Sequence, residues 1–512
     1  MAACAVMTEA RAAGGGDVPY DLLIIGGGIN GAGIARDAAG RGLSVCLVEQ
    51  DDLAAHTSSA STKLIHGGLR YLEHGELRLV REALAERERL LAIAPHIVRP
   101  LRFVLPYVDG LRPRWLLRLG LFVYDHAGGR EKLAASAGTR LAGTPLGAPL
   151  REGITDGFEY SDCAVDDSRL VVLNAMDAAE RGATILTCLR VVAAEAHGAR
   201  WQITCEARAG TRRVLHARAV VNASGSWVNH VLGTLSVEPR KHVRLVKGSH
   251  LVLKQQYSGE HAYLMQSPDN RVVFAIPWEG YTLVGTTDMP FTGDPAKVEI
   301  DPGEQDYLLE CLNRFLRRPA STADIVSTYA GVRGLYDDGS AKAAQQVSRD
   351  YHLELQHRAD APALSIYGGK ITTYRRLAEH ALQVLLPGLG VDESQTWTDQ
   401  EPLPGGDIAD ADLGRFITSS HSRWPGLPPA LLTHLARHYG TRMARILGAA
   451  RRIEDLGARF GAVLTQAEVD YLVRNEWART AEDILWRRTR LGLAMPDSAV
   501  HDLQDAVTKL LG

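Results

Sequence analysis

The stretch that decides the fold is YDLLIIGGGINGAGIARDAAGR, residues 20–41. Residues 20–25 form an apolar run typical of a buried parallel strand. The run leads directly into a cluster of glycines and then into a helical pattern; the glycines are Gly26, Gly27, Gly28 and Gly31. Glycines in this context allow a tight turn, and they let backbone N–H groups approach a pyrophosphate at the positive end of the helix. The stretch therefore predicts a dinucleotide-binding domain.

The residues that follow strengthen this prediction. A second apolar run, residues 43–48, ends at Glu49, about 20 residues beyond the glycines, where an acidic side chain binds the adenosine ribose hydroxyls. A third run, residues 219–223, ends in a turn where Ala223 and Gly225 would approach the same cofactor. An ordinary strand ending at glycine explains those residues nearly as well. No second strand–GxGxxG–helix pattern occurs in residues 50–512, so we expect one dinucleotide, FAD or NAD.

The composition is that of a soluble globular protein. The chain has 512 residues, of which 46% are hydrophobic and 23% charged, enough for roughly three structural units. Its 57 basic and 60 acidic residues give a net charge of -3, so no chain-wide basic field predicts a nucleic-acid partner. The six cysteines are scattered without zinc spacing, which predicts neither a structural metal nor a disulfide framework and indicates a reducing compartment.

Two features of the sequence concern membranes. Residues 1–19 lack the basic start and long apolar core of a signal peptide, and we expect a flexible tail there. No window approaches ~18 uninterrupted apolar residues, which excludes a spanning helix but leaves attachment to a membrane face open. Residues 99–132 interleave arginines with Trp115, Phe122 and several leucines, a pattern that suits an anionic membrane surface. A buried helix with snorkelling arginines fits the same residues equally well.

Three blocks of sequence carry a resemblance to a known family: residues 25–42 (IGGGINGAGIARDAAGRG), 58–73 (SSASTKLIHGGLRYLE) and 368–378 (GGKITTYRRLA). The chain resembles the FAD-dependent glycerol-3-phosphate dehydrogenases, in particular the aerobic, respiratory bacterial enzymes. The resemblance runs from about residue 20 to near the C-terminus. It implies oxidation of sn-glycerol 3-phosphate to dihydroxyacetone phosphate by hydride transfer to FAD, with electrons passed to a respiratory quinone. It further implies an enzyme bound peripherally to the cytoplasmic side of the inner membrane, or otherwise cytoplasmic.

The expected fold is α/β, with a Rossmann-type FAD-binding domain of the glycine and D-amino acid oxidase kind. Short apolar runs alternating with turns predict an antiparallel substrate-binding sheet at about residues 243–330, inserted into a discontinuous FAD-binding domain over residues 20–400. After Gly406 the pattern changes to helical period, so residues 401–512 are expected to form a separate helical domain.

The chemistry of the implied reaction selects candidate site residues. A phosphorylated substrate needs cations, because the arginine fork donates two parallel hydrogen bonds and lysine acts as a point charge. The resemblance to the family implies that the substrate is bound by Arg70, Tyr71, Arg333 and Lys370. Taking the hydroxyl proton requires a base, for which we favour His250, with Arg333 and Lys370 completing the catalytic set and His66 nearer the flavin. A structural role for either histidine is about as probable.

Cofactor contacts are expected from a larger set that spans all three blocks. Its members are Gly26, Gly27, Gly28, Gly31, Glu49, Ser58, Ser59, Thr62, Lys63, His66, Ala223, Gly225, Gly369, Lys370, Thr372 and Thr373. Thr372 and Thr373 could instead cap the helical run that follows them. No metal ligand set is expected.

Two other functions compete with this interpretation. One is an oxygen-reducing oxidase of the same fold, acting on glycerol 3-phosphate, an amine or a hydroxy acid. The other is a non-catalytic binding protein that keeps the flavoprotein fold as a docking surface. The expected partners are glycerol 3-phosphate, a quinone and a membrane surface, with a homodimer left open and no nucleic acid.

Overall fold

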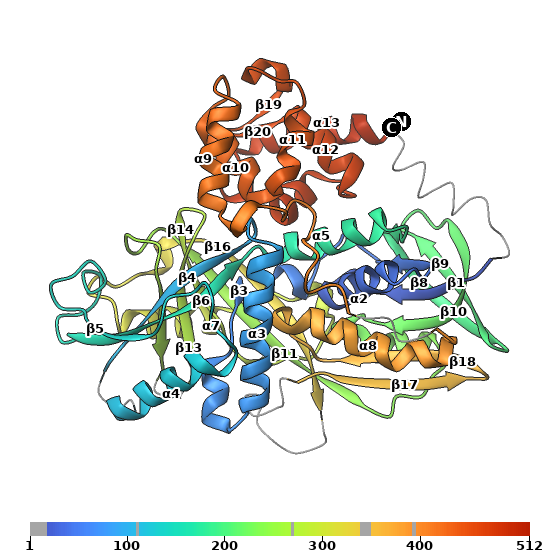
Figure 1. The fold of residues 1–512 in the computed structure, drawn as a ribbon, viewed down its shortest axis with the longest axis horizontal. Helices are drawn as coiled ribbons and strands as arrows, with labels where there is room; N and C mark the ends of the chain where they lie inside the picture. Colours follow the sequence, from blue (N-terminus) through green and yellow to red (C-terminus); the bar gives the residue numbers. More distant parts are fainter. Residues whose placement is uncertain (1–17, 109–111, 268–270, 338–349, 392–395) are drawn as a thin grey trace.

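The computed structural model describes residues 18–108, 112–267, 271–337, 350–391 and 396–512, apart from the side chains of Arg70, Glu73 and His74. In the view of Figure 1 a nucleotide-binding sheet lies on the right, a second sheet on the left and the C-terminal helices above them. The N-terminal tail predicted for residues 1–19 falls almost entirely outside the described residues.

The nucleotide-binding sheet has eight strands, with the central order β17-β18-β10-β1-β2-β7. Its strands are β1 (Tyr20–Ile25), β2 (Val45–Val48), β7 (Thr184–Leu186), β8 (Leu189–His197), β9 (Arg200–Ala207), β10 (Arg212–Asn222), β17 (His352–Arg358) and β18 (Ala361–Tyr367). The core pairs β18-β10-β1-β2-β7 are parallel, while β8, β9 and β17 add antiparallel edges.

Both faces of strand β1 are covered, which explains its continuous apolar run. Leu22 and Ile24 pack against a helical layer formed by α2 (Ile29–Gly40), α5 (Asp167–Glu180) and α8 (Tyr374–Leu389). Leu23 and Ile25 pack on the opposite side against β8, β9 and α6 (Val228–Thr234). After β1 the chain adds β2 and then β7 on one side of β1. It then returns to form β10 on the other side of β1, so the order of the strands reverses between β1 and β10. Ligands bind at such switch points, beyond the carboxyl ends of the strands.

The second sheet has ten strands and is larger than the insertion expected at about 243–330. Its strands are β3 (Leu64–Ile65), β4 (Val98–Pro106), β5 (Ala137–Arg140), β6 (Asp156–Val165), β11 (His242–Leu253), β12 (Ala262–Gln266), β13 (Val272–Trp278), β14 (Tyr281–Gly285), β15 (Met289–Pro290) and β16 (Ile325–Asp337). The early strands join because β4 pairs in parallel with β12, a long-range contact that local alternation cannot indicate. Three helices pack around this sheet: α3 (Leu77–Ile93), α4 (Arg114–Ala127) and α7 (Pro302–Asn313).

The C-terminal region is helical, as expected. Its elements are α9 (Leu413–Arg423), α10 (Pro429–Tyr439), α11 (Met443–Leu447), β19 (Arg459–Phe460), β20 (Leu464–Thr465), α12 (Gln466–Asn475), the single π-helical turn η11 (Asp483–Arg488) and α13 (Asp497–Leu511). It is not an independent body, because one continuous apolar cluster includes Leu435 and Leu472 together with Leu170 of α5 and Leu377 of α8. The C-terminal region is therefore packed directly onto the helical face of the nucleotide-binding sheet.

Candidate active site

A cavity of about 870 Å³ opens where the two sheets meet. At one end it is lined by the turns after β1 and β10, and at the other by residues of β11 and β16. Most of the expected site residues line it: Gly26, Gly28, Glu49, Ser58, Thr62, His66, Tyr71, Ala223, Gly225, His250, Arg333, Gly369, Lys370 and Thr372. Five others, Gly27, Gly31, Ser59, Lys63 and Thr373, are not among its lining residues. The side chain of Arg70 lies outside the described part of the chain, so its predicted substrate contact stays a prediction.

The dinucleotide end of the cavity is built from close backbone approaches. Gly26 has a φ of +114°, and a Cβ there would lie 2.7 Å from the carbonyl oxygen of Ala223. A Cβ on Gly31 would lie 1.9 Å from the carbonyl oxygen of Gly26. Only glycine fits either position, so the turn brings the backbone of β1, β10 and α2 together without side chains in between. Gly27 and Gly31 are thus needed to shape the turn although they do not line the cavity.

Glu49 closes the turn from the end of β2. Its carboxylate accepts hydrogen bonds from the backbone N–H of Gly27 at 2.6 Å and of Asp51 at 2.8 Å. Burial raises the pKa of Glu49, while these two bonds and nearby His56 act in the opposite direction. The ring of His56 also packs against Trp227 in a tilted arrangement, with ring centroids 4.7 Å apart, which gives this end of the cavity an aromatic wall.

Glu49, Asp51 and His56 bring one ligand-type atom each within 4.8 Å of one another. These groups are already engaged within the protein, because Asp51 pairs with His56 at 2.9 Å and with Arg208, and Glu49 accepts two backbone bonds. The cluster is better explained as a polar site for ribose hydroxyls than as a cation site, since acidic groups near one another are common without a metal.

The residues from Ser58 to Lys63 divide into two sets. Ser58 and Thr62 face the main cavity, and the Oγ of Ser58 accepts the backbone N–H of Ile29 at 3.0 Å, at the start of α2. Ser59 and Lys63 line a second cavity of about 420 Å³ instead. The ammonium of Lys63 is buried and binds the carboxylate of Asp167 at 2.7 Å. A buried carboxylate from α5 therefore holds the Lys63 side chain away from the main cavity, and the predicted cofactor contact of this residue stays a prediction.

His250 is the most constrained of the candidate catalytic residues. Its ring is buried on β11, stacks on Tyr329 at 4.7 Å between centroids, and has Nε2 3.0 Å from the hydroxyl of Thr62. Space for the ring comes from Gly285, where a Cβ would lie 2.1 Å from the imidazole. Nδ1 has no hydrogen-bond partner among the described residues. A neutral imidazole has one N–H and one lone pair, so when Thr62 accepts from Nε2, Nδ1 keeps a lone pair that can take a proton.

The electrostatics of His250 predict where activity falls in acid. Burial lowers its pKa well below the usual value near 6.5, and the positive charges of Lys63 and Arg333 lower it further. A depressed pKa keeps the ring neutral, and able to accept a proton, down to lower pH. We expect the acidic limb of kcat/KM assigned to this group to lie below pH 6.5. His250→Asn should abolish that limb and reduce kcat by ~10²–10⁴-fold. A pH profile in which the variant keeps the wild-type limb would show that another group is the base.

Arg333 extends from β16 beside His250. Its guanidinium binds the carboxylate of Asp288 at 2.6 Å and the backbone carbonyl of Thr287 at 3.1 Å. A Cβ on Gly248, in the neighbouring strand, would lie 2.7 Å from a guanidinium nitrogen. Glycine at that position therefore makes room for the arginine. The Arg333 side chain is 27% exposed and lines the cavity, while Asp288 and the carbonyl of Thr287 hold its guanidinium in place.

Lys370 and its neighbours complete the opposite wall. The ammonium lies 4.1 Å from the centroid of the Tyr71 ring, a cation–π contact that orients it. Lys370 precedes the turn Ile371–Thr373, which leads into α8, and Thr372 is buried with its hydroxyl 3.4 Å from the backbone nitrogen of His66. Thr373 occupies the N-cap position of α8, but its side chain makes no capping hydrogen bond there.

Sequence reasoning missed two residues at the site. Asn30 lines the cavity, donates to the carbonyl of Gly368 at 3.3 Å, and leaves a buried Oδ1 without a partner among the described residues. Its place inside the glycine motif could have identified it. Asp288 anchors Arg333, and only its position in the stretch Gly285–Asp288, which the resemblance includes, pointed to it.

Comparison with known proteins now decides the family. A family model described as FAD dependent oxidoreductase matches residues 21–375, and one described as the C-terminal domain of alpha-glycerophosphate oxidase matches residues 396–512. A glycerol-3-phosphate dehydrogenase of Pseudomonas aeruginosa is 51% identical over 94% of this chain and 93% of its own. The aerobic glycerol-3-phosphate dehydrogenase of Escherichia coli is 47% identical over 92% of this chain and 94% of its own. The chain belongs to the FAD-dependent glycerol-3-phosphate dehydrogenase family.

The chain is also similar to a relative named for another polyol phosphate and to a solved structure with FAD. A D-erythritol 1-phosphate dehydrogenase of Brucella abortus is 50% identical over 92% of this chain and 94% of its own. The solved structure of a glycerol-3-phosphate dehydrogenase from Bacillus halodurans, complexed with FAD, is 28% identical, covers 98% of this chain and 92% of that chain, and has a TM-score of 0.76. The predicted resemblance, fold class and FAD cofactor are confirmed.

The residues present fit FAD. The turn at Gly26 and Gly31 has no side chain to obstruct a pyrophosphate, and the start of α2 offers backbone N–H groups toward it. Glu49 supplies carboxylate oxygens where a ribose belongs, and Asn30, whose Oδ1 has no partner among the described residues, lines the cavity beside them. The expected cofactor residues that line the cavity can reach a bound cofactor, and their individual roles stay predictions.

Proposed function

We propose that this protein oxidises sn-glycerol 3-phosphate to dihydroxyacetone phosphate and passes the electrons through FAD to a respiratory quinone. The observation that carries the proposal is that Arg333, Lys370 and His250 line the same cavity as the dinucleotide turn. Two cations suit a phosphate ester, and a neutral buried imidazole suits a hydroxyl that must lose its proton. The family relatives named above support the same substrate class.

The residues divide the reaction between them. FAD, when bound, supplies the acceptor for the hydride that leaves the C2 carbon. Arg333 and Lys370 hold the phosphate and fix the orientation of the substrate, and Arg333 is itself held by Asp288. His250 takes the C2 hydroxyl proton, while Thr62 and Tyr329 keep its ring in place. Burial of His250 keeps water away from this base.

A second substrate is favoured by a specific observation. The Brucella abortus relative, named for D-erythritol 1-phosphate, is as similar to this chain as the glycerol-3-phosphate dehydrogenases are. Both substrates are polyol phosphates and differ by one hydroxylated carbon. The cations that bind phosphate serve either molecule, so the discrimination must lie in the space around the polyol chain.

The test is the visible spectrum of the anaerobic holoenzyme, mixed separately with sn-glycerol 3-phosphate, D-erythritol 1-phosphate, glycerol and lactate. We expect the oxidised flavin band to bleach with glycerol 3-phosphate and to persist with glycerol and lactate, which lack the phosphate. Faster bleaching by the erythritol ester would assign the second substrate. A flavin that stays oxidised with both esters would refute the proposal. Re-oxidation of the bleached enzyme by a soluble quinone in the absence of oxygen then tests the acceptor.

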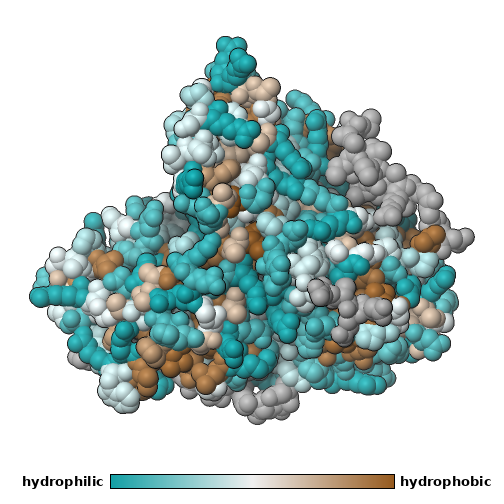
Figure 2. All heavy atoms as spheres, in the orientation of Figure 1, coloured by the Kyte–Doolittle hydropathy of each residue, from teal (hydrophilic) through white to brown (hydrophobic). Residues whose placement is uncertain are grey.

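We further propose that the protein binds the membrane through α4. This helix exposes Trp115, Leu119 and Phe122, which are 68%, 50% and 53% accessible and share one stripe at helical spacing. Figure 2 shows a hydrophobic patch at the edge of the molecule where Figure 1 places α4. Arg114 and Arg118 flank the stripe, as suits a helix lying at an anionic headgroup surface. Within the described residues, no helix has the length and hydropathy needed to cross a bilayer.

A triple variant tests this surface. Replacing Trp115, Leu119 and Phe122 by serine should lower binding to vesicles containing phosphatidylglycerol by at least ~10-fold, because apolar area no longer enters the interface. The matched control is Val214→Ser with Leu511→Ser, which removes exposed apolar side chains elsewhere. Co-sedimentation measures both. Equal binding by the triple variant and wild type would exclude α4 as the membrane surface.

A further inference from the structure

The C-terminal helical region contacts the segment that follows the ribose-binding carboxylate. Residues 52–63, called here the flavin-facing segment, contain little regular structure beyond one short turn, Thr57–Ser59. Most of the segment lines the main cavity: Ala54, Ala55, His56, Thr57, Ser58, Ala60, Ser61 and Thr62. A segment without its own hydrogen-bonded framework needs outside contacts to keep one shape.

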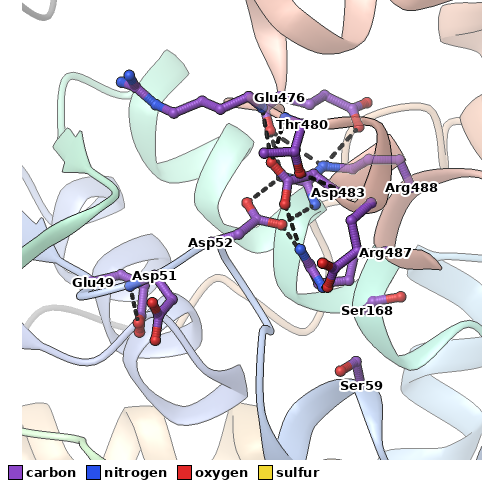
Figure 3. Close-up of polar contacts among 12 residues, drawn as sticks. Glu49, Asp51, Asp52, Ser59, Ser168, Glu476, Thr480, Asp483, Arg487 and Arg488 are labelled. Carbon is purple, nitrogen blue, oxygen red and sulfur yellow. Dashed lines mark hydrogen bonds and ion pairs between the residues drawn. The ribbon is translucent and has the colours of Figure 1, made fainter. Parts of the chain in front are cut away.

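The N-terminal end of the segment is held by an arginine side chain from the C-terminal region. Asp52 is buried, and Arg488 donates to its two carboxylate oxygens at 2.7 and 2.9 Å. Arg487 donates a further bond to Asp52 at 2.7 Å, and the group gathers around η11 (Figure 3). Burial alone would raise the pKa of Asp52, but the two guanidinium groups hold it below its usual value, so the ion pairs are formed at neutral pH. Asp52 directly follows Asp51, whose backbone N–H donates to Glu49.

The second end is anchored through a shared carboxylate. Asp167, at the start of α5, accepts from Lys63 at 2.7 Å and from the hydroxyl of Ser61 at 2.6 Å. Arg490 reaches the other oxygen of Asp167 at 2.5 Å and binds Asp166 at 2.6 Å. Arg490 has a φ of +57°, an uncommon conformation for a non-glycine residue, and its side chain is buried. Two cations and two carboxylates thus form a neutral cluster behind the segment.

The anchored segment transmits its position to both halves of the site. Ser58 contacts the first residue of α2, where the dinucleotide turn ends, and Thr62 contacts His250. From the second sheet, Tyr329 donates to the carbonyl of Ser61 at 2.8 Å and supports the same stretch. A shift of the segment would therefore move the cofactor contacts and the base together.

We propose that Arg488 and Arg490 are positioning residues: by anchoring Asp52 and Asp167 they hold residues 52–63 in the shape that binds FAD. Neither arginine lines the main cavity. Through these two arginines, the C-terminal region contributes to FAD binding. The proposal depends on the FAD cofactor but not on which substrate the enzyme takes.

The test compares Arg490→Met with Arg490→Lys and with Arg442→Gln in the full-length chain. Arg442 pairs with Glu180 across the same boundary, but it has no contact with residues 52–63 among the described residues, and it serves as the matched control. The readouts are the Kd of the apoprotein for FAD, the absorption spectrum and midpoint potential of the bound flavin, and the melting temperature of the apoprotein. None of them needs substrate, so their outcome is separate from that of the proposed function.

We expect Arg490→Met to raise the Kd for FAD by ~10–100-fold, as is usual when a residue that orients a ligand-binding group is lost. The removed charge leaves one buried carboxylate unbalanced beside the segment, so the flavin midpoint potential should also fall. Arg490→Lys should restore part of the affinity because it keeps the charge but loses the fork. If Arg490→Met fails to fold, Arg490→Lys alone tests the proposal. We then expect Arg490→Lys to raise the Kd for FAD by at least ~3-fold. If Arg490 variants lower the melting temperature as Arg442→Gln does and bind FAD like wild type, the arginine is only structural.

Discussion

We expect Gly31→Ala to weaken flavin binding strongly. The added Cβ would lie 1.9 Å from the carbonyl oxygen of Gly26, which is backbone and cannot rotate away. The turn that carries the pyrophosphate site must therefore move. Overpacking of this kind costs about 1–3 kcal/mol or more, equivalent to a fall in FAD affinity of ~10–100-fold. The absorbance ratio of flavin to protein after gel filtration and the melting temperature of the holoenzyme measure the effect.

Gly388→Ala is the control for this prediction. Gly388 is also helical, at the end of α8, but nothing lies within 4 Å of a Cβ placed there. Alanine should be neutral or slightly stabilising at that position, because it restricts the unfolded chain without a clash. Full flavin content and an unchanged melting temperature in Gly31→Ala would show that the turn is more adaptable than its close contacts indicate.

Arg333→Met lowers kcat/KM by at least ~30-fold and raises KM while it lowers kcat. Removing the cation that would face a bound phosphate costs about 2–5 kcal/mol, because the phosphate and Asp288 are left without their partner. Both kinetic constants should change if, as proposed, the arginine holds the phosphate in the ground state and orients the reacting carbon in the transition state. Steady-state kinetics with sn-glycerol 3-phosphate and a soluble acceptor measure the change.

The matched control is Arg244→Met. Arg244 lies on β11 and pairs with Asp337 of β16 at 3.2 Å, so it joins the same two strands, but it does not line the cavity. Its loss should leave both kinetic constants within about twofold of wild type, because a part-exposed ion pair away from the cavity contributes little to stability and does not face the substrate. The double variant Arg333→Met with Asp288→Asn separates phosphate binding from the unpaired carboxylate. Wild-type kinetics in Arg333→Met would remove the residue from the substrate site.

Much of the cofactor half of the site could be predicted from the sequence, because its determinants are local. A strand, a glycine turn and a helix adjoin one another in the chain, and the close contacts of Gly26 and Gly31 follow from that connection. Glu49 ends the next strand and contacts Gly27 as its spacing indicates. The resemblance extended this to FAD and to the fold class.

The roles of Lys63 and His250 could not be decided in the same way. Lys63 lies within a block that the resemblance covers, yet its partner Asp167 comes from a helix 104 residues away in the chain. His250 was about equally probable as a base or as a structural residue. Its surroundings now favour the base, because Gly285, Tyr329 and Thr62 hold a neutral ring at the cavity with one nitrogen unpaired. The small residues Gly248 and Gly285 were a usable signal, since glycine within a strand often marks a close approach.

The sequence by itself determined the dinucleotide turn, the parallel strands around it and the helical character of the C-terminal region, because each depends on neighbouring residues. Only the tertiary structure decided how the substrate end is assembled. Thr62, His250, Arg333 and Lys370 come from four distant parts of the chain, and the register between β11 and β16 sets which side chains meet. It also decided that the C-terminal arginines reach the flavin-facing segment, since buried ion pairs form wherever packing brings opposite charges together.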